Sequence, residues 1–163
     1  MPEYLILLGS NIDADAKIPA AIELLEALPD LYVRSVSGVY ESPAVVATGE
    51  IDPARNPYHN AAVLISTDLD RDRLRRELRQ IEEALGRVRQ EDKYADRTID
   101  LDIVGVASTP DRCDIDPIVR EQGFASLPVA EIAASWQLEP NGATLGELAQ
   151  EHQRHQTPVR RIG

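Results

Sequence analysis

Apolar residues along this chain recur either at every second position or at every third to fourth position, and these two spacings predict strands and helices. Helical spacing covers residues 16–28 and 70–85, with Asp70 as a candidate N-cap and Gly86 as a candidate C-cap of the second helix. The remaining apolar segments have the character of strands, and they cover residues 4–8, 31–40, 58–67 and 97–106. Gly38 is a candidate bulge within the second of these strands.

The segments between and after these elements are more polar. They predict loops over 41–57 and 87–96, a polar connection over 108–117, a short helical turn over 129–134, a last helix opened by the capping box at 144–147, and a frayed basic tail over 152–163. No repeat or linker divides the chain. Strands interleaved with helices therefore predict a single α+β domain over residues 1–163, with helices layered against a sheet.

Composition narrows the class of protein. The 163 residues carry a formal net charge of -11, which argues against a nucleic-acid partner, because such domains are usually basic. No apolar segment approaches the ~20 residues that span a bilayer, and the first residues lack a signal-peptide pattern. The one cysteine, Cys113, excludes an intrachain disulfide and is interpreted as a passive loop thiol. We expect a cytoplasmic monomer.

Candidate chemistry begins with two aspartates two residues apart, Asp100 and Asp102, in a segment with strand alternation. Residues i and i+2 of a strand point to the same face, so two carboxylates would lie side by side while Ile99, Leu101 and Ile103 enter the core. Close like charges resist ionisation unless a cation lies between them. Carboxylate oxygens with open positions suit magnesium that also binds substrate phosphates. The alternative is an edge strand with a solvated polar face.

Basic residues precede this acid pair in an otherwise acidic chain. They lie in Gly86-Arg87-Val88-Arg89 and at Lys93 and Arg97. An anionic substrate needs a local positive basin in a repelling field. Cations beside a metal-binding acid pair therefore indicate a polyphosphate site.

Several motifs in chain order resemble the 6-hydroxymethyl-7,8-dihydropterin pyrophosphokinase family. The specific ones are Gly86-Arg87-Val88-Arg89 and Arg97-Thr98-Ile99-Asp100-Leu101-Asp102-Ile103, which start eleven residues apart. Supporting matches are Leu8-Gly9-Ser10-Asn11, Val39-Tyr40-Glu41-Ser42-Pro43, Tyr58-His59-Asn60-Ala61-Ala62-Val63 and Gly123-Phe124. The resemblance weakens after residue 106. It implies a layered sandwich with a ferredoxin-like core, an antiparallel or mixed sheet and flanking helices.

The resemblance also implies a reaction and a set of site residues. The family transfers the pyrophosphate of ATP to the hydroxymethyl group of a reduced pterin and releases AMP. The implied residues are Asp100 and Asp102 for two Mg²⁺ ions, Arg87 and Arg97 for the phosphates, Glu82, Arg89 and Arg79 for the nucleotide, and Gly9, Pro43, Val45, Tyr58, Asn60 and Phe124 for the pterin. Two of these have a second interpretation from the sequence, because Glu82 could be a solvated helix acid and Phe124 a plain core residue.

Three single positions and one short segment depart from the family pattern. Asp116 stands where the family has a histidine that helps bind nucleotide, and Gln122 replaces an arginine before the stacking aromatic. Arg79 replaces a glutamine, and Tyr94-Ala95-Asp96-Arg97 replaces Trp-Gly-Pro-Arg. These departures keep two alternatives open besides an active pyrophosphokinase: a paralogue with altered substrate or weak activity, and a non-catalytic pterin-binding module.

Overall fold

Within the residues described by the computed structural model (1–44, 49–86, 99–109, 111–139, 142–155 and 159–163), all strands belong to one sheet. The elements follow in the order β1 (Glu3–Ser10), α1 (Ala14–Glu26), β2 (Leu31–Val36), β3 (Tyr40–Ser42), β4 (Tyr58–Thr67), α2 (Arg71–Ala84), β5 (Asp100–Thr109), β6 (Arg112–Ile115), α3 (Pro117–Glu121), α4 (Gly123–Ala133), α5 (Leu145–His155) and β7 (Arg160–Arg161). The sheet order is β6-β5-β1-β4-β3-β7, and β2 also pairs with β4.

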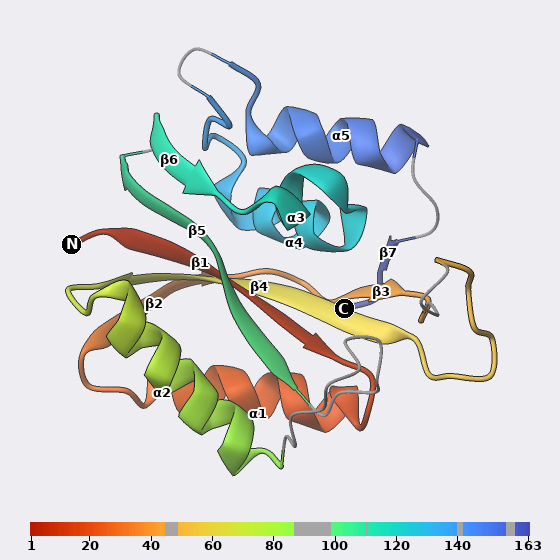
Figure 1. Ribbon diagram of the computed structural model, residues 1–163, viewed down its shortest axis with the longest axis horizontal. Helices are drawn as coiled ribbons and strands as arrows, with labels where there is room; N and C mark the ends of the chain where they lie inside the picture. Colours follow the sequence, from red (N-terminus) through yellow and green to blue (C-terminus); the bar gives the residue numbers. More distant parts are fainter. Residues whose placement is uncertain (45–48, 87–98, 110, 140–141, 156–158) are drawn as a thin grey trace.

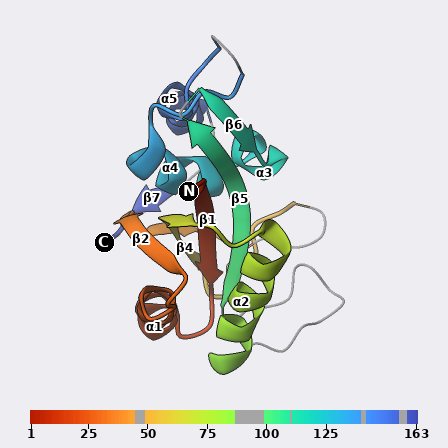
Figure 2. The same cartoon turned by 90° about the vertical axis from the view of Figure 1, so that its left-hand side faces the viewer.

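Helices cover both faces of this sheet. Helices α1 and α2 lie on one face, and α3, α4 and α5 lie on the other (Figure 1; Figure 2). The central strand β1 contributes to both apolar cores, since Ile6 and Leu8 face α1 and α2 while Leu5 and Leu7 face α4. Burial on both faces explains why this strand is a continuous apolar segment rather than an alternating one.

The first part of the chain is a ferredoxin-like core. The elements β1-α1-β2 and β4-α2-β5 form two interleaved βαβ units, and the strand pairs β5-β1, β1-β4 and β4-β2 are all antiparallel. The prediction of a layered α+β sandwich is confirmed. Its helix over 70–85 is also confirmed, because the Asp70 side chain accepts a hydrogen bond from the Arg73 amide at 2.9 Å and Gly86 follows the helix at φ 90°.

The predicted strand over 31–40 is interrupted. Strand β2 ends at Val36 and β3 begins at Tyr40, and the register shift lies between Val33 and Ser35 rather than at Gly38. The bulge prediction at Gly38 is therefore wrong. Glycine is needed there for a different reason, since a Cβ would collide with the Gly163 carbonyl oxygen.

The prediction was least accurate after residue 106. The 108–117 connection contains β6 and the start of α3, and the turn over 129–134 is the second half of α4, which carries Pro128 inside it. The prediction of a frayed tail is wrong for its described parts, 152–155 and 159–163, because His152 on α5 is buried and β7 pairs with β3. The His152 ring contacts Ser126 Oγ through Nδ1 at 2.5 Å and the Arg120 carbonyl oxygen through Nε2 at 3.0 Å, so it joins three helices.

Cys113 lies on β6 rather than in a loop, and it is half-buried. Burial raises the pKa of its thiol. No helix among the described residues is long and apolar enough to cross a membrane.

Candidate active site

The two aspartates of the acid pair lie at the start of β5 on the sheet face that carries α4. Asp100 pairs in register with Gly9 and Asp102 with Leu7, both on β1. Asp100 is half-buried and Asp102 exposed, whereas Leu101 between them is 4% exposed and packs on the opposite face. The predicted separation of faces is confirmed. Two carboxylates thus lie on one face of the sheet, the face that carries α4.

Asp100 on β5 belongs to a row of residues that pair in register across four strands. The row continues through Gly9 on β1 to Asn60 on β4 and Tyr40 on β3. The Asn60 side chain is 4% exposed, and its Nδ2 donates a hydrogen bond to Ser42 Oγ at 3.1 Å. A Cβ on Gly9 would lie 3.2 Å from Asn60 Oδ1. The glycine therefore lets the amide lie close against β1, where its orientation is fixed by Ser42. Sequence reasoning missed Ser42, although strand alternation from Tyr40 places it on this face.

The other predicted pterin residues come from separate elements. Tyr58 begins β4 and pairs in register with Ser42, and Pro43 directly follows β3; both are half-buried. Phe124 lies in the first turn of α4, half-buried and packed against the core beneath that helix. A half-buried ring leaves one part available to stack on a ligand, so both interpretations of Phe124 stay open. Val45 lies outside the described residues.

Glu82 reaches the acid pair from the opposite side of the sheet. It lies on α2, is 2% exposed, and its Oε2 accepts a hydrogen bond from the Leu101 amide at 2.8 Å. The alternative interpretation of Glu82 as a solvated acid is therefore wrong. Arg79, one turn earlier, is exposed on the outer surface of α2. Arg87, Arg89 and Arg97 lie outside the described residues.

The acid pair suits magnesium by its donor chemistry. Its ligand atoms are carboxylate oxygens on one face, from the half-buried Asp100 and the exposed Asp102. Water and substrate oxygens can therefore complete an octahedron. Within the described part of the chain, no group of three or more His, Cys, Asp or Glu residues could form a metal cage by itself. That arrangement fits a metal held jointly with a phosphate rather than a closed structural site.

Comparison with known proteins decides the family. Residues 5–134 match the sequence profile of the family described as 7,8-dihydro-6-hydroxymethylpterin-pyrophosphokinase (HPPK). The chain belongs to this family. As an HPPK-family protein it is a diphosphotransferase of folate biosynthesis, the class that the sequence predicted.

Curated relatives and solved structures agree with the HPPK assignment. The 2-amino-4-hydroxy-6-hydroxymethyldihydropteridine pyrophosphokinase of Methylorubrum extorquens is 39% identical over 131 residues, covering 77% of this chain and 79% of the relative. The Bacillus subtilis enzyme of the same name is 36% identical over 151 residues, covering 90% and 85%. The wild-type HPPK-DHPS of Plasmodium falciparum shares the fold, with a TM-score of 0.66 at 12% identity. The structural match covers 99% of this chain and 48% of the Plasmodium falciparum chain.

One departure from the HPPK pattern, Asp116, has a structural role at the start of a helix, whereas the Gln122 side chain makes no capping hydrogen bond to α4. Asp116 caps α3, since its Oδ1 accepts a hydrogen bond from the Ile118 amide at 3.0 Å. Gln122 is exposed between α3 and α4, and its carbonyl oxygen accepts from the Ala125 and Ser126 amides. An aspartate at 116 therefore stabilises the fold locally, whatever its effect on nucleotide affinity.

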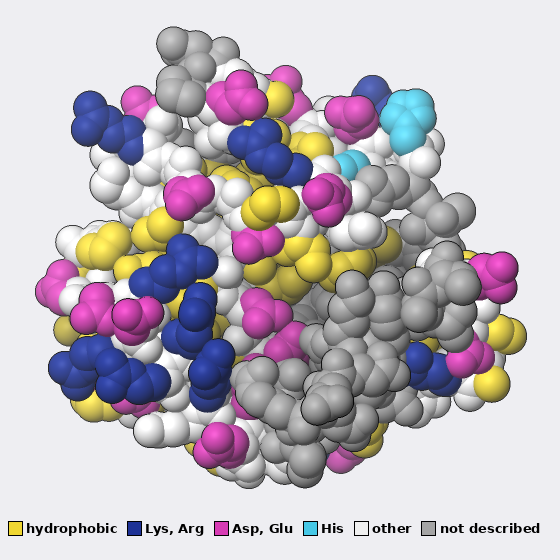
Figure 3. Space-filling model, in the orientation of Figure 1, with side chains coloured by type: hydrophobic (Ala, Val, Ile, Leu, Met, Phe, Trp, Pro, Cys, Tyr) yellow, Lys and Arg dark blue, Asp and Glu magenta, His cyan; other side chains and the backbone are white. Residues whose placement is uncertain are grey.

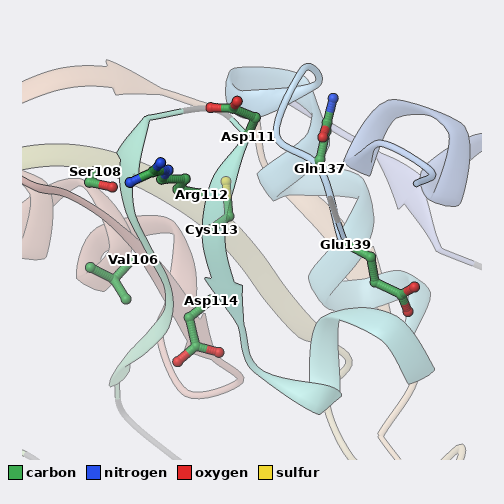
Figure 4. Close-up of a pocket in the computed structure, with 8 residues that line it drawn as sticks. All are labelled: Val106, Ser108, Asp111, Arg112, Cys113, Asp114, Gln137 and Glu139. Carbon is green, nitrogen blue, oxygen red and sulfur yellow. The ribbon is translucent and has the colours of Figure 1, made fainter. Parts of the chain in front are cut away.

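A separate cavity of about 340 Å³ lies at the other end of β5. It is lined by β5, β6 and the segment after α4, at Val106, Ser108, Asp111, Arg112, Cys113, Asp114, Gln137 and Glu139 (Figure 4). It contains none of the residues predicted for the HPPK reaction.

Proposed function

We propose that this protein transfers pyrophosphate from ATP to the hydroxymethyl group of 6-hydroxymethyl-7,8-dihydropterin. The hydroxymethyl oxygen forms a bond to the β-phosphorus, the bond from that phosphorus to the α-β bridging oxygen breaks, and AMP leaves as the hydroxyl proton is released. The observation that supports the proposal is the row from Asp100 through Gly9 to Asn60, in which a carboxylate and a hydrogen-bonded amide share one sheet face.

The residues assigned to the pterin have separate roles in the proposal. Asn60 hydrogen-bonds the donor and acceptor edges of the pterin, with its orientation held by Ser42. Phe124 stacks on the pterin ring, and Tyr58, Pro43 and Val45 line the same site. The arrangement favours positioning, because pyrophosphoryl transfer needs alignment and electrostatic stabilisation more than covalent help.

Asp100 and Asp102 would hold two Mg²⁺ ions. Bound magnesium neutralises phosphate charge and helps align the reacting oxygen with phosphorus. Arg87 and Arg97 supply further positive charge to the phosphates in this proposal, with Arg89 and Arg79 on the nucleotide side. These arginine roles rest on the sequence motifs alone. A cytoplasmic, monomeric single domain is part of the same proposal, supported by the lone cysteine and the acidic surface.

The direct test is AMP release by the purified protein from ATP, Mg²⁺ and the reduced pterin, with a reaction lacking pterin as the background. Asp100→Asn and Asp102→Asn should each lower turnover by at least about 100-fold, because each removes one of the charges that hold the metal. Asp114→Asn is the matched control, since Asp114 is an exposed strand aspartate outside the row.

Near-normal turnover in either acid-pair variant would overturn the metal assignment. If the folded wild-type protein released no pterin-dependent AMP, the proposed reaction would be wrong. Pterin binding measured by calorimetry would then separate an altered substrate from a pure binding module, because only the module binds pterin independently of Mg²⁺ and nucleotide.

A further inference from the structure

Glu82 is a charged residue placed where charge is costly. Its side chain is 2% exposed on the face of α2 that packs against β5, among the apolar residues of that core. Burying a carboxylate is strongly unfavourable unless it is paired or hydrogen-bonded. A hydrophobic residue would fill the same helix position at no such cost. The position of this acid therefore requires a function that an apolar side chain cannot supply.

Its hydrogen bond to Leu101 shows what that function is. The bond of 2.8 Å joins Oε2 of Glu82 to the backbone amide of the residue between Asp100 and Asp102. Backbone amides of an antiparallel strand point alternately to its two edges. Strand β1 occupies one edge of β5 along this segment, whereas β6 pairs with the other edge only from Gly105 onward. Among the residues that the structure describes, no strand pairs with that edge before Gly105, and the Glu82 carboxylate accepts a hydrogen bond from the Leu101 amide there instead.

We infer that Glu82 is a positioning residue. By accepting a hydrogen bond from the Leu101 amide, it fixes the backbone conformation of β5 between Asp100 and Asp102. The inference rests on the proposed metal role of Asp100 and Asp102. With Leu101 tied to α2 at this edge and β1 paired at the other, the strand cannot rotate about its axis. The two flanking carboxylates then keep one separation and one direction. In this role Glu82 acts through the backbone amide of Leu101.

The decisive comparison is between Glu82→Gln and Glu82→Ala. Glutamine keeps an oxygen that accepts from the Leu101 amide and removes only the charge, whereas alanine removes the acceptor. Glu83→Gln is the matched control, because Glu83 is the adjacent acid of α2 and is exposed. Three quantities are measured: Leu101 amide exchange by NMR, Mn²⁺ affinity by electron paramagnetic resonance without nucleotide, and kcat and KM for AMP release.

Glu82→Ala should speed exchange at Leu101 by about ten-fold or more while exchange at Ile65 on the central strand β4 stays unchanged. It should weaken Mn²⁺ binding and lower kcat by about 100-fold, the scale expected for a misplacement near 1 Å, with the KM for ATP within about three-fold. Glu82→Gln should exchange at the Leu101 amide as slowly as wild type and keep kcat within about three-fold of the wild-type value. Glu83→Gln should match wild type in all three.

Three results would overturn the inference. Equal losses in Glu82→Gln and Glu82→Ala would mean that the charge itself is required. A raised KM for ATP with an unchanged kcat would mean direct nucleotide contact. Unchanged Leu101 exchange in Glu82→Ala would mean that the hydrogen bond does not order the strand. Failure of the proposed function can be told apart from failure of this inference. If wild type released no AMP, the amide exchange and Mn²⁺ affinity could still be compared among the variants.

Discussion

At the scale of single residues, Gly9 shows how little space separates the side-chain amide of Asn60 from strand β1. An added Cβ would lie 3.2 Å from Asn60 Oδ1, and Asn60 cannot move away without giving up its bond to Ser42. Gly9→Ala should therefore raise the KM for pterin several-fold, about ten-fold at most, through the shifted amide. Steady-state AMP release measures this.

Gly105→Ala is the matched control for that prediction. Its Cβ would meet Ile115 Cδ1 at 3.2 Å and Leu5 Cδ1 at 3.3 Å, so the crowding is similar but lies in the apolar core away from Asn60. It should lower thermal stability and leave the KM for pterin unchanged. Equal KM values for Gly9→Ala and wild type would show that the amide does not contact the pterin.

Tyr40 gives a prediction on alkaline stability. Burial, followed by the 2.7 Å hydrogen bond to Glu131, raises the pKa of this phenol from 10.0 to about 12. The unfolded chain ionises first as pH rises, so the contribution is fully present below pH 10 and is lost progressively up to about pH 12. A two-unit shift corresponds to about 3 kcal/mol.

The measurement for Tyr40 is urea unfolding from pH 8 to 11.5 for wild type and Tyr40→Phe. Wild type should lose stability across this window, and the variant should be less stable at pH 8 but flatter with pH. The free energies of the two proteins should converge at high pH. Parallel curves would mean that Tyr40 is not the group responsible.

At the scale of elements, a helix or strand can be predicted from the sequence when one of its faces is apolar and the other is polar. Helix α2 was predictable because Leu74 and Leu78 form a stripe on an otherwise charged helix. Helix α4 is buried along most of its circumference and carries Pro128 inside, so it has neither a polar face nor a clear start. Strand β7 is two residues long, and its partner β3 lies more than a hundred residues earlier, which no local pattern reveals.

The candidate site likewise has features that the sequence predicts and features that it does not. The strand alternation of Asp100 and Asp102 predicts that they share a face, and the structure confirms it. The burial of Glu82 could not be predicted, because it depends on α2 packing against the open edge of β5. Tertiary contacts between distant segments are what single-sequence reasoning lacks.

Strand β7 provides a prediction at this scale. The Ile162 amide donates to the Val39 carbonyl and the Val39 amide to the Gly163 carbonyl, each at 2.8 Å, while Arg161 binds Glu131 at 2.9 Å. At about 1 kcal/mol for each of these three interactions, ending the chain after His155 should cost about 3 kcal/mol. For a chain of this size, that corresponds to a Tm lower by about 6–12 °C.

Scanning calorimetry of the shortened chain and of Arg160→Ala tests this prediction. The Arg160 side chain is 73% exposed and pairs with Glu41, so its removal should change the Tm by about 2 °C or less. A shortened chain with a wild-type Tm would show that the β7 contacts do not persist in solution.

At the scale of the whole molecule, charge is unevenly distributed. The formal net charge is -11, yet five of the 17 basic residues, Arg71, Arg73, Arg75, Arg76 and Arg79, are exposed on α2. Lys and Arg side chains gather over this helix, with acidic side chains spread around them (Figure 3). None of the five makes an ion pair with another described residue within 4.0 Å. These arginines therefore interact with the acidic molecule through its long-range field.

The dependence of the Tm on salt should show whether the attraction between the α2 arginines and the acidic residues or the repulsion among the acidic residues is larger. Screening removes both, and the repulsion should dominate because the chain has 28 acidic residues against 17 basic ones. We expect the Tm to rise by a few degrees, about 3–5 °C, between about 20 mM and 500 mM NaCl at pH 7.5. The control is the same titration at pH 5, near the sequence pI of 4.7, where the rise should disappear. A Tm that falls with salt at pH 7.5 would mean that the attraction between the α2 arginines and their acidic surroundings outweighs the repulsion among the acids.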